Sequence, residues 1–162
     1  MLTFTYNLQT MNKKIDTIRK TRIKIIEGLK DLTSAQLNKI PQGFNNNIIW
    51  NLGHMIAAQE GILYLRGGHP LRIKQDFFDS YKMGSKPERE LVDSEIEDIR
   101  SLLISSLDYL ETDFEAGLFQ VYPNWTTRFG VDVSSFDDAM NFLIFHEGLH
   151  LGCITALKKL TV

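Results

Sequence analysis

Residues 134–159 read SSFDDAMNFLIFHEGLHLGCITALKK, and their apolar side chains recur at helical spacing rather than at the alternate positions of a strand. Ser134 or Ser135 can cap the first turn, since a serine hydroxyl accepts a hydrogen bond from an unpaired backbone N–H. Two lysines occupy the expected last turn, where cations complement the helix dipole. We therefore predict a long helix that begins at one of these serines and ends near Leu160.

The first helical segment of the chain carries an apolar stripe at spacings of three, four and seven residues. Its basic residues, Arg22 among them, are expected mostly on the other faces. A short helical turn, capped by Thr33 or Ser34, should follow and stop before Pro41. The stripe consists of Ile15, Ile18, Ile25, Leu29 and Leu32, so the helix is predicted to end near Leu32.

Two more long helices are predicted between these segments. The second should begin near Asn46 or Asn47, whose side chains can cap it, and should end near Arg66. The third follows an Asp-Ser pair, where Ser94 and Glu97 have the spacing of a capping box. No segment alternates with the period of two that a half-buried strand would show.

Four helices of about 20 residues bury their apolar stripes most simply as an all-α four-helix bundle, and 162 residues suit a single domain over 1–162. The connections at 67–92 and 115–133 are long for a bundle and rich in aromatic residues. We expect them to be packed coverings over one end of the bundle, where they can shape a pocket.

The overall composition excludes several classes of protein. A formal net charge of −2, with charges of both signs interspersed, gives no basic surface for nucleic acid. Neither a signal-like N-terminus nor an apolar run of about 18 residues is present, so a cytoplasmic protein with no membrane partner is expected. The single cysteine, Cys153, fits a reducing compartment and is predicted to be a buried core residue.

The motif that points to chemistry is H-E-x-x-H at His146, Glu147 and His150. Histidines four residues apart share a helix face, and this face points into the predicted bundle, where a divalent cation would satisfy both imidazoles. The motif also occurs in metallopeptidases, which supply a third ligand downstream. Only twelve residues follow His150 here, and none is Glu, Asp or His. A peptidase is therefore disfavoured.

The third ligand must come from upstream, and the candidates are His54 and His69. His69 precedes a proline in a glycine-rich break, which favours a solvated loop residue. His54 lies mid-helix beside small residues that leave room for a ligand. The resulting hypothesis is a three-histidine site with a fourth position open to water or substrate.

Two stretches, DLTSAQLNKIPQGFNNNIIWNLGHMIAAQE at 31–60 and residues 134–159, together resemble the DinB/YfiT superfamily. The Y-x-x-G run at Tyr81–Gly84 is similar to a turn of that family. The resemblance implies an up-down-down-up four-helix bundle, frequent homodimers, and a divalent ion, commonly zinc or nickel. Its metal ligands would be His54, His146 and His150. The family often has Gln where this chain has Cys153.

Three further residues are candidate site residues. Glu147, on the flank of the metal face, is the candidate catalytic residue as a general base, and the alternative is a half-exposed helical glutamate paired with a basic residue. Asn51 and Trp50 are the candidate substrate-binding residues, and Asn51 alternatively bonds a loop carbonyl. A transferase would also need cations to hold its substrate, for which Arg66, Arg72, Lys74 and Arg128 are candidates.

The glycines of the last helix suggest close approach of another helix, because glycine in a helix costs about 1 kcal/mol and such contact would offset it. The approaching helix belongs either to the same bundle or to a second copy across a two-fold interface. We predict a homodimer through outward apolar faces that include Ile49, Leu52, Ile56, Ile144, Phe145, Gly148, Leu151 and Gly152.

The resemblance favours thiol chemistry for the function, since some members of the family use low-molecular-weight thiols. The leading hypothesis is therefore a metal-dependent thiol S-transferase, in which a thiol activated by the ion attacks an electrophile. A metal-dependent hydrolase and a non-catalytic, stress-associated metal-binding protein remain the alternatives.

Overall fold

A computed structural model describes residues 8–161, which form four long helices with short elements between them. The long helices are α1 (Leu8–Gly28), α3 (Ile48–Gln59), α5 (Asp93–Glu115) and α6 (Phe136–Thr161). α3 continues without a break into the π-helical segment η1 (Glu60–Leu65). The all-α bundle predicted from the sequence is confirmed, although α1 ends at Gly28 rather than near Leu32.

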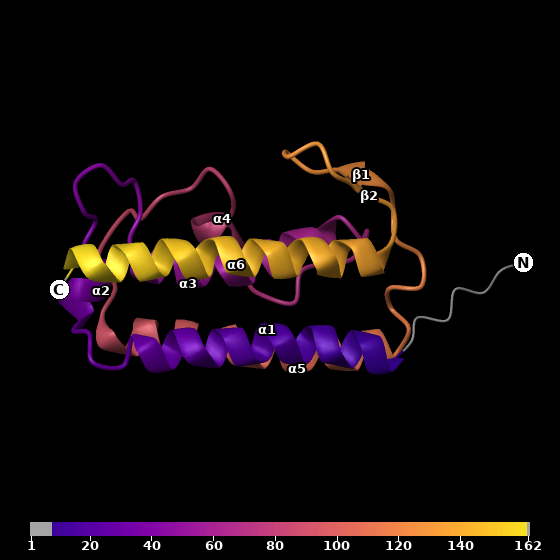
Figure 1. Ribbon diagram of the computed structural model, residues 1–162, viewed down its shortest axis with the longest axis horizontal. Coiled ribbons are helices and arrows are strands. Elements are labelled where there is room, and N and C mark those ends of the chain that lie inside the picture. Colours follow the sequence, from indigo (N-terminus) through magenta and orange to yellow (C-terminus); the bar gives the residue numbers. More distant parts are fainter. Residues whose placement is uncertain (1–7, 162) are drawn as a thin grey trace, which may run out of the picture.

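The helices form two layers, with α3 and α6 in one and α1 and α5 in the other (Figure 1). Each helix packs against two neighbours, so that contacts run from α1 to α6, from α6 to α3, from α3 to α5 and back to α1. In Figure 1, α1 and α6 run in one direction and α3 and α5 in the opposite direction.

The long connections contain three short elements that the sequence did not predict. α4 (Gln75–Tyr81) packs on α3, and β1 (Trp125–Thr126) pairs antiparallel with β2 (Asp132–Val133), which contacts α6. The 67–92 connection, with α4, lies along the α3–α6 layer, whereas the 115–133 connection passes around one end of the bundle, as expected, before its hairpin lies beside α6 (Figure 1). Aromatic residues of α4 and of the hairpin pack on the helices of this layer.

Polar side chains mark the helix starts largely as predicted. Thr33 caps the short helix α2 (Ser34–Asn38), and Asn47 accepts a hydrogen bond from the N–H of Trp50 at 2.8 Å. For α6, the N–H of Asp138 donates to Ser135 Oγ at 3.1 Å. The Ser94–Glu97 capping box is wrong, because α5 begins one residue before Ser94 and the side chain of Glu95 accepts from the N–H of Val92 instead.

The core consists of two apolar clusters separated by a buried polar layer. This layer is centred on Arg22, which is 0% exposed, so its predicted place on a polar face is wrong. Its guanidinium donates to both carboxylate oxygens of Glu147, at 2.7 and 3.1 Å. The remaining acceptors are Gln59 Oε1, Ser106 Oγ and the carbonyl oxygens of Leu103 and Met55. Arg22 therefore contacts all three other long helices.

A second buried polar cluster surrounds η1. Glu60 is buried and accepts a hydrogen bond from the backbone N–H of Arg72 at 2.7 Å. The guanidinium of Arg72 binds the carboxylate of Asp113, which also accepts from the hydroxyl of Tyr64 at 2.8 Å. These bonds tie the connection after η1 to α5. Burial raises the pKa of Glu60 to about 7.

This raised pKa predicts a pH effect on stability. The folded protein keeps the carboxyl of Glu60 protonated at pH values where the unfolded chain, with a pKa of 4.5, has released the proton. Stability from this group is full below pH 4.5 and is lost as the pH rises through 7, a difference of roughly 3 kcal/mol.

Glu60→Gln removes the titrating group and should reduce the loss of thermal stability between pH 5 and pH 8 by several degrees. Thermal denaturation at pH 5 and at pH 8 gives the change in melting temperature for the variant and for the wild type. Comparing these two changes cancels any effect of the amide that does not depend on pH. An unchanged pH dependence in the variant would show that Glu60 does not titrate in this range.

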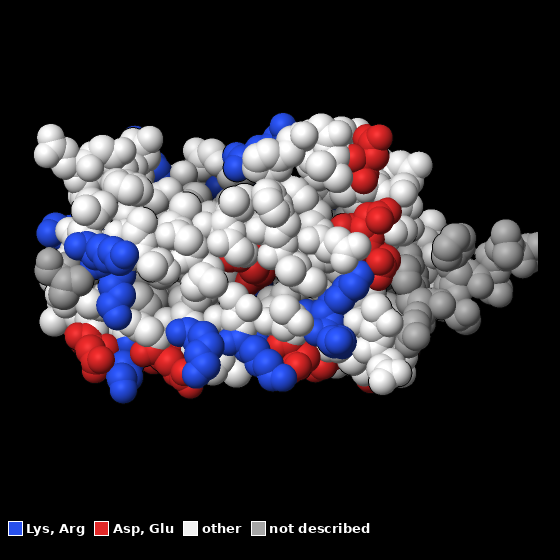
Figure 2. All heavy atoms as spheres, viewed as in Figure 1, with Lys and Arg blue, Asp and Glu red and all other residues white. Residues whose placement is uncertain are grey.

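The outer face of α6 is apolar and uncovered in this single chain. Phe145 is 49% exposed, and Leu149, Leu151 and Cys153 are also exposed, so the predicted core position of Cys153 is wrong. Figure 2 shows this face as a mostly uncharged band beside the charged surface of α1. Three residues predicted to share an outward face, Ile49, Leu52 and Ile56, lie instead in the core. Within residues 8–161, no helix is both long and apolar enough to cross a membrane.

Candidate metal centre

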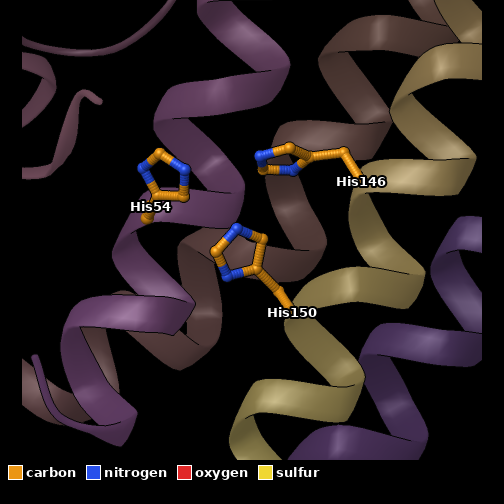
Figure 3. A group of neighbouring side chains, drawn as sticks. All are labelled: His54, His146 and His150. Carbon is orange, nitrogen blue, oxygen red and sulfur yellow. The ribbon is translucent and has the colours of Figure 1, made fainter. Parts of the chain in front are cut away.

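Three histidines meet between α3 and α6, about midway along both helices. His54 comes from α3, and His146 and His150 come from α6 one turn apart (Figure 3). One ring nitrogen from each lies within 4.8 Å of the others. The structure therefore brings together the three residues that the sequence selected, in an arrangement that can hold one metal ion.

Hydrogen bonds fix two of these rings. Nδ1 of His54 lies 2.7 Å from the carbonyl oxygen of Tyr81, and Nδ1 of His150 lies 2.8 Å from Oδ1 of Asn51. Because both oxygens accept, each Nδ1 carries the proton and Nε2 keeps a free lone pair. Nδ1 of His146 is buried and has no hydrogen-bond partner among the described residues. A metal ion would satisfy this third imidazole.

Both polar atoms of the Asn51 side chain have hydrogen-bond partners around this site. Its Oδ1 accepts from His150, and its Nδ2 donates to Asn46 Oδ1 at 3.1 Å and to the carbonyl oxygen of Asn47 at 2.8 Å. The bond to the carbonyl of Asn47, which precedes α3, confirms the alternative that Asn51 bonds a loop carbonyl. The bond to His150 adds a positioning role that was not predicted, and substrate binding by Asn51 stays a prediction.

The glycine before His54 has a specific packing role. A Cβ on Gly53 would lie 2.4 Å from the ring of Tyr81, so only glycine lets that ring approach α3. Close approach of Tyr81 brings its carbonyl oxygen to His54. Gly84, with φ of +90°, then turns the chain in a conformation that favours glycine. The Y-x-x-G run therefore supports the candidate metal site from outside α3 and α6.

Trp50 packs directly on the site. Its ring stacks on His54 with centroids 4.7 Å apart, and its Nε1 donates to Ser85 Oγ at 3.2 Å. Trp50 also lines a pocket of about 540 Å³, together with Tyr81, Ser85 and residues 86–89, but no histidine borders it. Its predicted role in substrate binding stays a prediction.

The electrostatics keep the histidines neutral at pH 7. Burial is the largest cause and lowers the pKa of His54, that of His146 to about 3 and that of His150 to about 4. The charge of Arg128 acts in the same direction on all three. Neutral imidazole is the form that binds metal, so protons do not compete for these nitrogens near neutral pH.

Two other candidates from the sequence lie outside this cluster. His69 contacts the edge of Phe119 and is not part of the group. Glu147 is 2% exposed and faces the core, so its expected half-exposure is wrong, whereas its expected pairing with a basic residue is confirmed by Arg22. The buried face of α6 is wider than the sequence predicted, since it includes Glu147 as well as the face of the two histidines. Spacings of four from Leu143 and of seven to Ile154 could have indicated that Glu147 also faces inward.

Comparison with known families decides the affiliation of the chain. A family model described as the DinB superfamily matches residues 17–154. The chain belongs to the DinB superfamily. This match spans α1 to α6 and includes all three histidines. No curated protein matches the sequence.

For this DinB-superfamily chain, the family and the three-histidine cluster together fit a metal-binding protein. The resemblance predicted from the sequence is thereby confirmed, and so is the place of His54 beside the pair on α6. The supporting contacts from Tyr81, Asn51 and Trp50 were not predicted.

The contact from Asn51 gives a testable prediction. Asn51→Ala leaves His150 without its acceptor, so metal affinity should fall about 10- to 100-fold while the protein remains folded. A competition titration with a chromophoric chelator measures the affinity, and circular dichroism checks the helices. Unchanged affinity would mean that His150 holds its orientation without Asn51.

Proposed function

We propose that this DinB-superfamily chain is a metal-dependent transferase that acts with a low-molecular-weight thiol. The observation that carries the proposal is the site of three neutral imidazoles, each able to offer one nitrogen to a common point. Zinc or nickel is the proposed ion, because imidazole nitrogen suits both. Thiol chemistry follows from the family resemblance.

A divalent ion on these nitrogens would lower the pKa of a thiol or polarise an electrophile. The chain's own residues prepare the site. Tyr81 and Asn51 hold two imidazoles in one tautomer, and Trp50 fixes the plane of His54. Three neutral ligands leave the full positive charge of the ion available to a thiolate.

A metal-dependent hydrolase with Glu147 as general base is the second candidate, and the contacts of Glu147 speak against it. Both carboxylate oxygens accept from the buried guanidinium of Arg22. A base needs a free lone pair directed at the attacking water. Glu147 is therefore better suited to fix the rotation of α6 than to accept a proton.

The test loads purified protein with zinc or nickel and supplies a thiol, such as cysteine, with the electrophile 1-chloro-2,4-dinitrobenzene. Formation of the thioether is followed by absorbance and mass spectrometry. Catalysis should require metal and should disappear in His146→Ala, while His69→Ala serves as the control. Stoichiometric metal without thioether, across several thiols and electrophiles, would favour the non-catalytic metal-binding protein.

We also propose that the chain forms a homodimer through the outer face of α6. Gly148 and Gly152 lie one turn apart on this face, and a Cβ on either would have no neighbour within 4 Å. Exposed Phe145 and Leu149 lie beside them. Small residues flanked by large apolar ones allow two helices to approach closely, and burial of this apolar area favours association.

Leu149→Glu places a charge on this face and should shift the protein from dimer to monomer at tens of micromolar. Sedimentation velocity measures the change. Ile23→Glu, on an exposed apolar residue of α1, is the matched control and should remain dimeric. A wild type that sediments only as a monomer at these concentrations would contradict the proposal.

A further inference from the structure

The β1–β2 hairpin is anchored on α6 next to the three-histidine site. Phe129, in its turn, packs against Phe142 and Phe145, with ring centroids 6.4 and 5.5 Å apart. Phe142 lies one helical turn before His146, and Phe145 directly precedes it. Thr127 is buried, and its Oγ1 accepts from the N–H groups of Phe129 and Val131. The hairpin turn is thereby held in a defined place.

Arg128 projects from this turn. Its guanidinium lies over the ring of Phe129, 4.8 Å from the centroid, and the residue is exposed. Among residues 8–161 it makes no ion pair. Its charge nevertheless acts on His54, His146 and His150 together. Basic side chains gather beside the hairpin tip in Figure 2.

The charged side chains that lower the pKa of the three histidines are cations. The charged side chains that act on the three histidines are Arg128 and, for His146, Arg22. Arg22 is already paired with Glu147. No carboxylate of the described chain belongs to the histidine group. A divalent ion on neutral imidazoles, with a guanidinium nearby, therefore gives a strongly positive site that a single thiolate would not neutralise.

The other arginines of this side are engaged elsewhere. Arg72 binds Asp113, and Arg66 lies over the ring of Trp125, 4.9 Å from its centroid. Of the three arginines considered from the sequence, Arg128 is the one in the hairpin turn that packs on α6 beside His146.

We propose that Arg128 binds a carboxylate of the molecule that occupies the open side of the three-histidine site. The ligand is then a small organic acid, with the carboxylate carried either by the thiol or by the electrophile. A guanidinium suits this task, because it donates two parallel hydrogen bonds to a carboxylate. The inference rests on the proposed function, since it takes the histidines to hold a divalent ion.

The test measures binding to cobalt(II)-loaded protein from its absorption spectrum, without turnover. Mercaptoacetate is compared with 2-mercaptoethanol, which has the thiol but no carboxylate. Propionate, added to protein saturated with 2-mercaptoethanol, tests a carboxylate carried by the second substrate. Each titration is made with the wild type, with Arg128→Gln, and with Arg66→Gln as a control that removes the same charge from the neighbourhood of the hairpin.

We expect Arg128→Gln to weaken mercaptoacetate or propionate binding about tenfold and to leave 2-mercaptoethanol unchanged. Binding of mercaptoacetate should weaken if the thiol carries the carboxylate. Binding of propionate should weaken if the electrophile carries it. Arg66→Gln should bind all three as the wild type does. An equal loss for all probes, or no loss for either carboxylate, would overturn the assignment of Arg128.

Failure of the proposed function is distinguishable from failure of this inference. If neither thiol binds cobalt-loaded protein, thiol chemistry is refuted, and glycolate then tests Arg128 alone. Weaker glycolate binding in Arg128→Gln would support the carboxylate site without the thiol. Equal glycolate binding in the two proteins would refute it.

Discussion

Replacing His54, His146 or His150 with alanine is expected to remove nearly all bound divalent metal from the purified protein. Each residue supplies one of three nitrogens within 4.8 Å of one another, and two ligands on α6 alone leave the coordination incomplete. The affinity should fall on the order of 100-fold or more for each variant. Elemental analysis gives the stoichiometry, and a chelator competition gives the dissociation constant.

His69→Ala is the matched control, because it removes an imidazole that lies outside the cluster. It should keep the metal content of the wild type. Circular dichroism must show that all four variants remain helical. Full metal retention in folded His54→Ala would refute a site shared between α3 and α6. A wild type that takes up no metal, even after reloading, would refute the metal centre altogether.

The second large effect is expected in the core. Arg22→Ala leaves the Glu147 carboxylate buried without its partner, and Glu147→Ala leaves the guanidinium in the same position. Breaking such a buried pair should cost about 3–5 kcal/mol of unfolding free energy, because one charge stays uncompensated in a low-dielectric interior. Urea denaturation measures the loss in both variants.

Removal of both charges separates this electrostatic cost from packing. The double variant Arg22→Met with Glu147→Leu should recover most of the stability lost in either single variant, since neither buried charge remains. The same variant should still bind metal, because its histidines are unchanged. A double variant as unstable as the sum of the single ones would show that the two side chains act independently.

The comparison of sequence and structure separates what local patterns can predict from what they cannot. The four long helices follow from the spacing of apolar residues. The start of α3 follows from Asn47 as a cap, and the start of the short helix α2 follows from Thr33. Both signals act within a few residues of sequence. The short elements α4, β1 and β2 carry no such periodicity, and they form where their aromatic side chains find the α3–α6 layer.

The buried polar residues show the limit of helix wheels most clearly. Arg22 and Glu147 were both expected outside the core, because each alone is too polar to bury. They lie inside because they meet each other, at positions 125 residues apart in the chain. Such a pairing is visible on neither helix by itself.

The sequence by itself determined the four long helices, through the spacing of apolar residues. It also selected the three histidines of the candidate metal centre, through the spacing of His146 and His150 and the small residues beside His54. The tertiary structure decided the rest of the site. It brought the carbonyl of Tyr81 to His54 across the gap that Gly53 leaves, and it placed Asn51 against His150. It also held Arg128 near the cluster through Phe129 and α6. These contacts join residues from separate elements, and only the packing of those elements brings them within bonding distance.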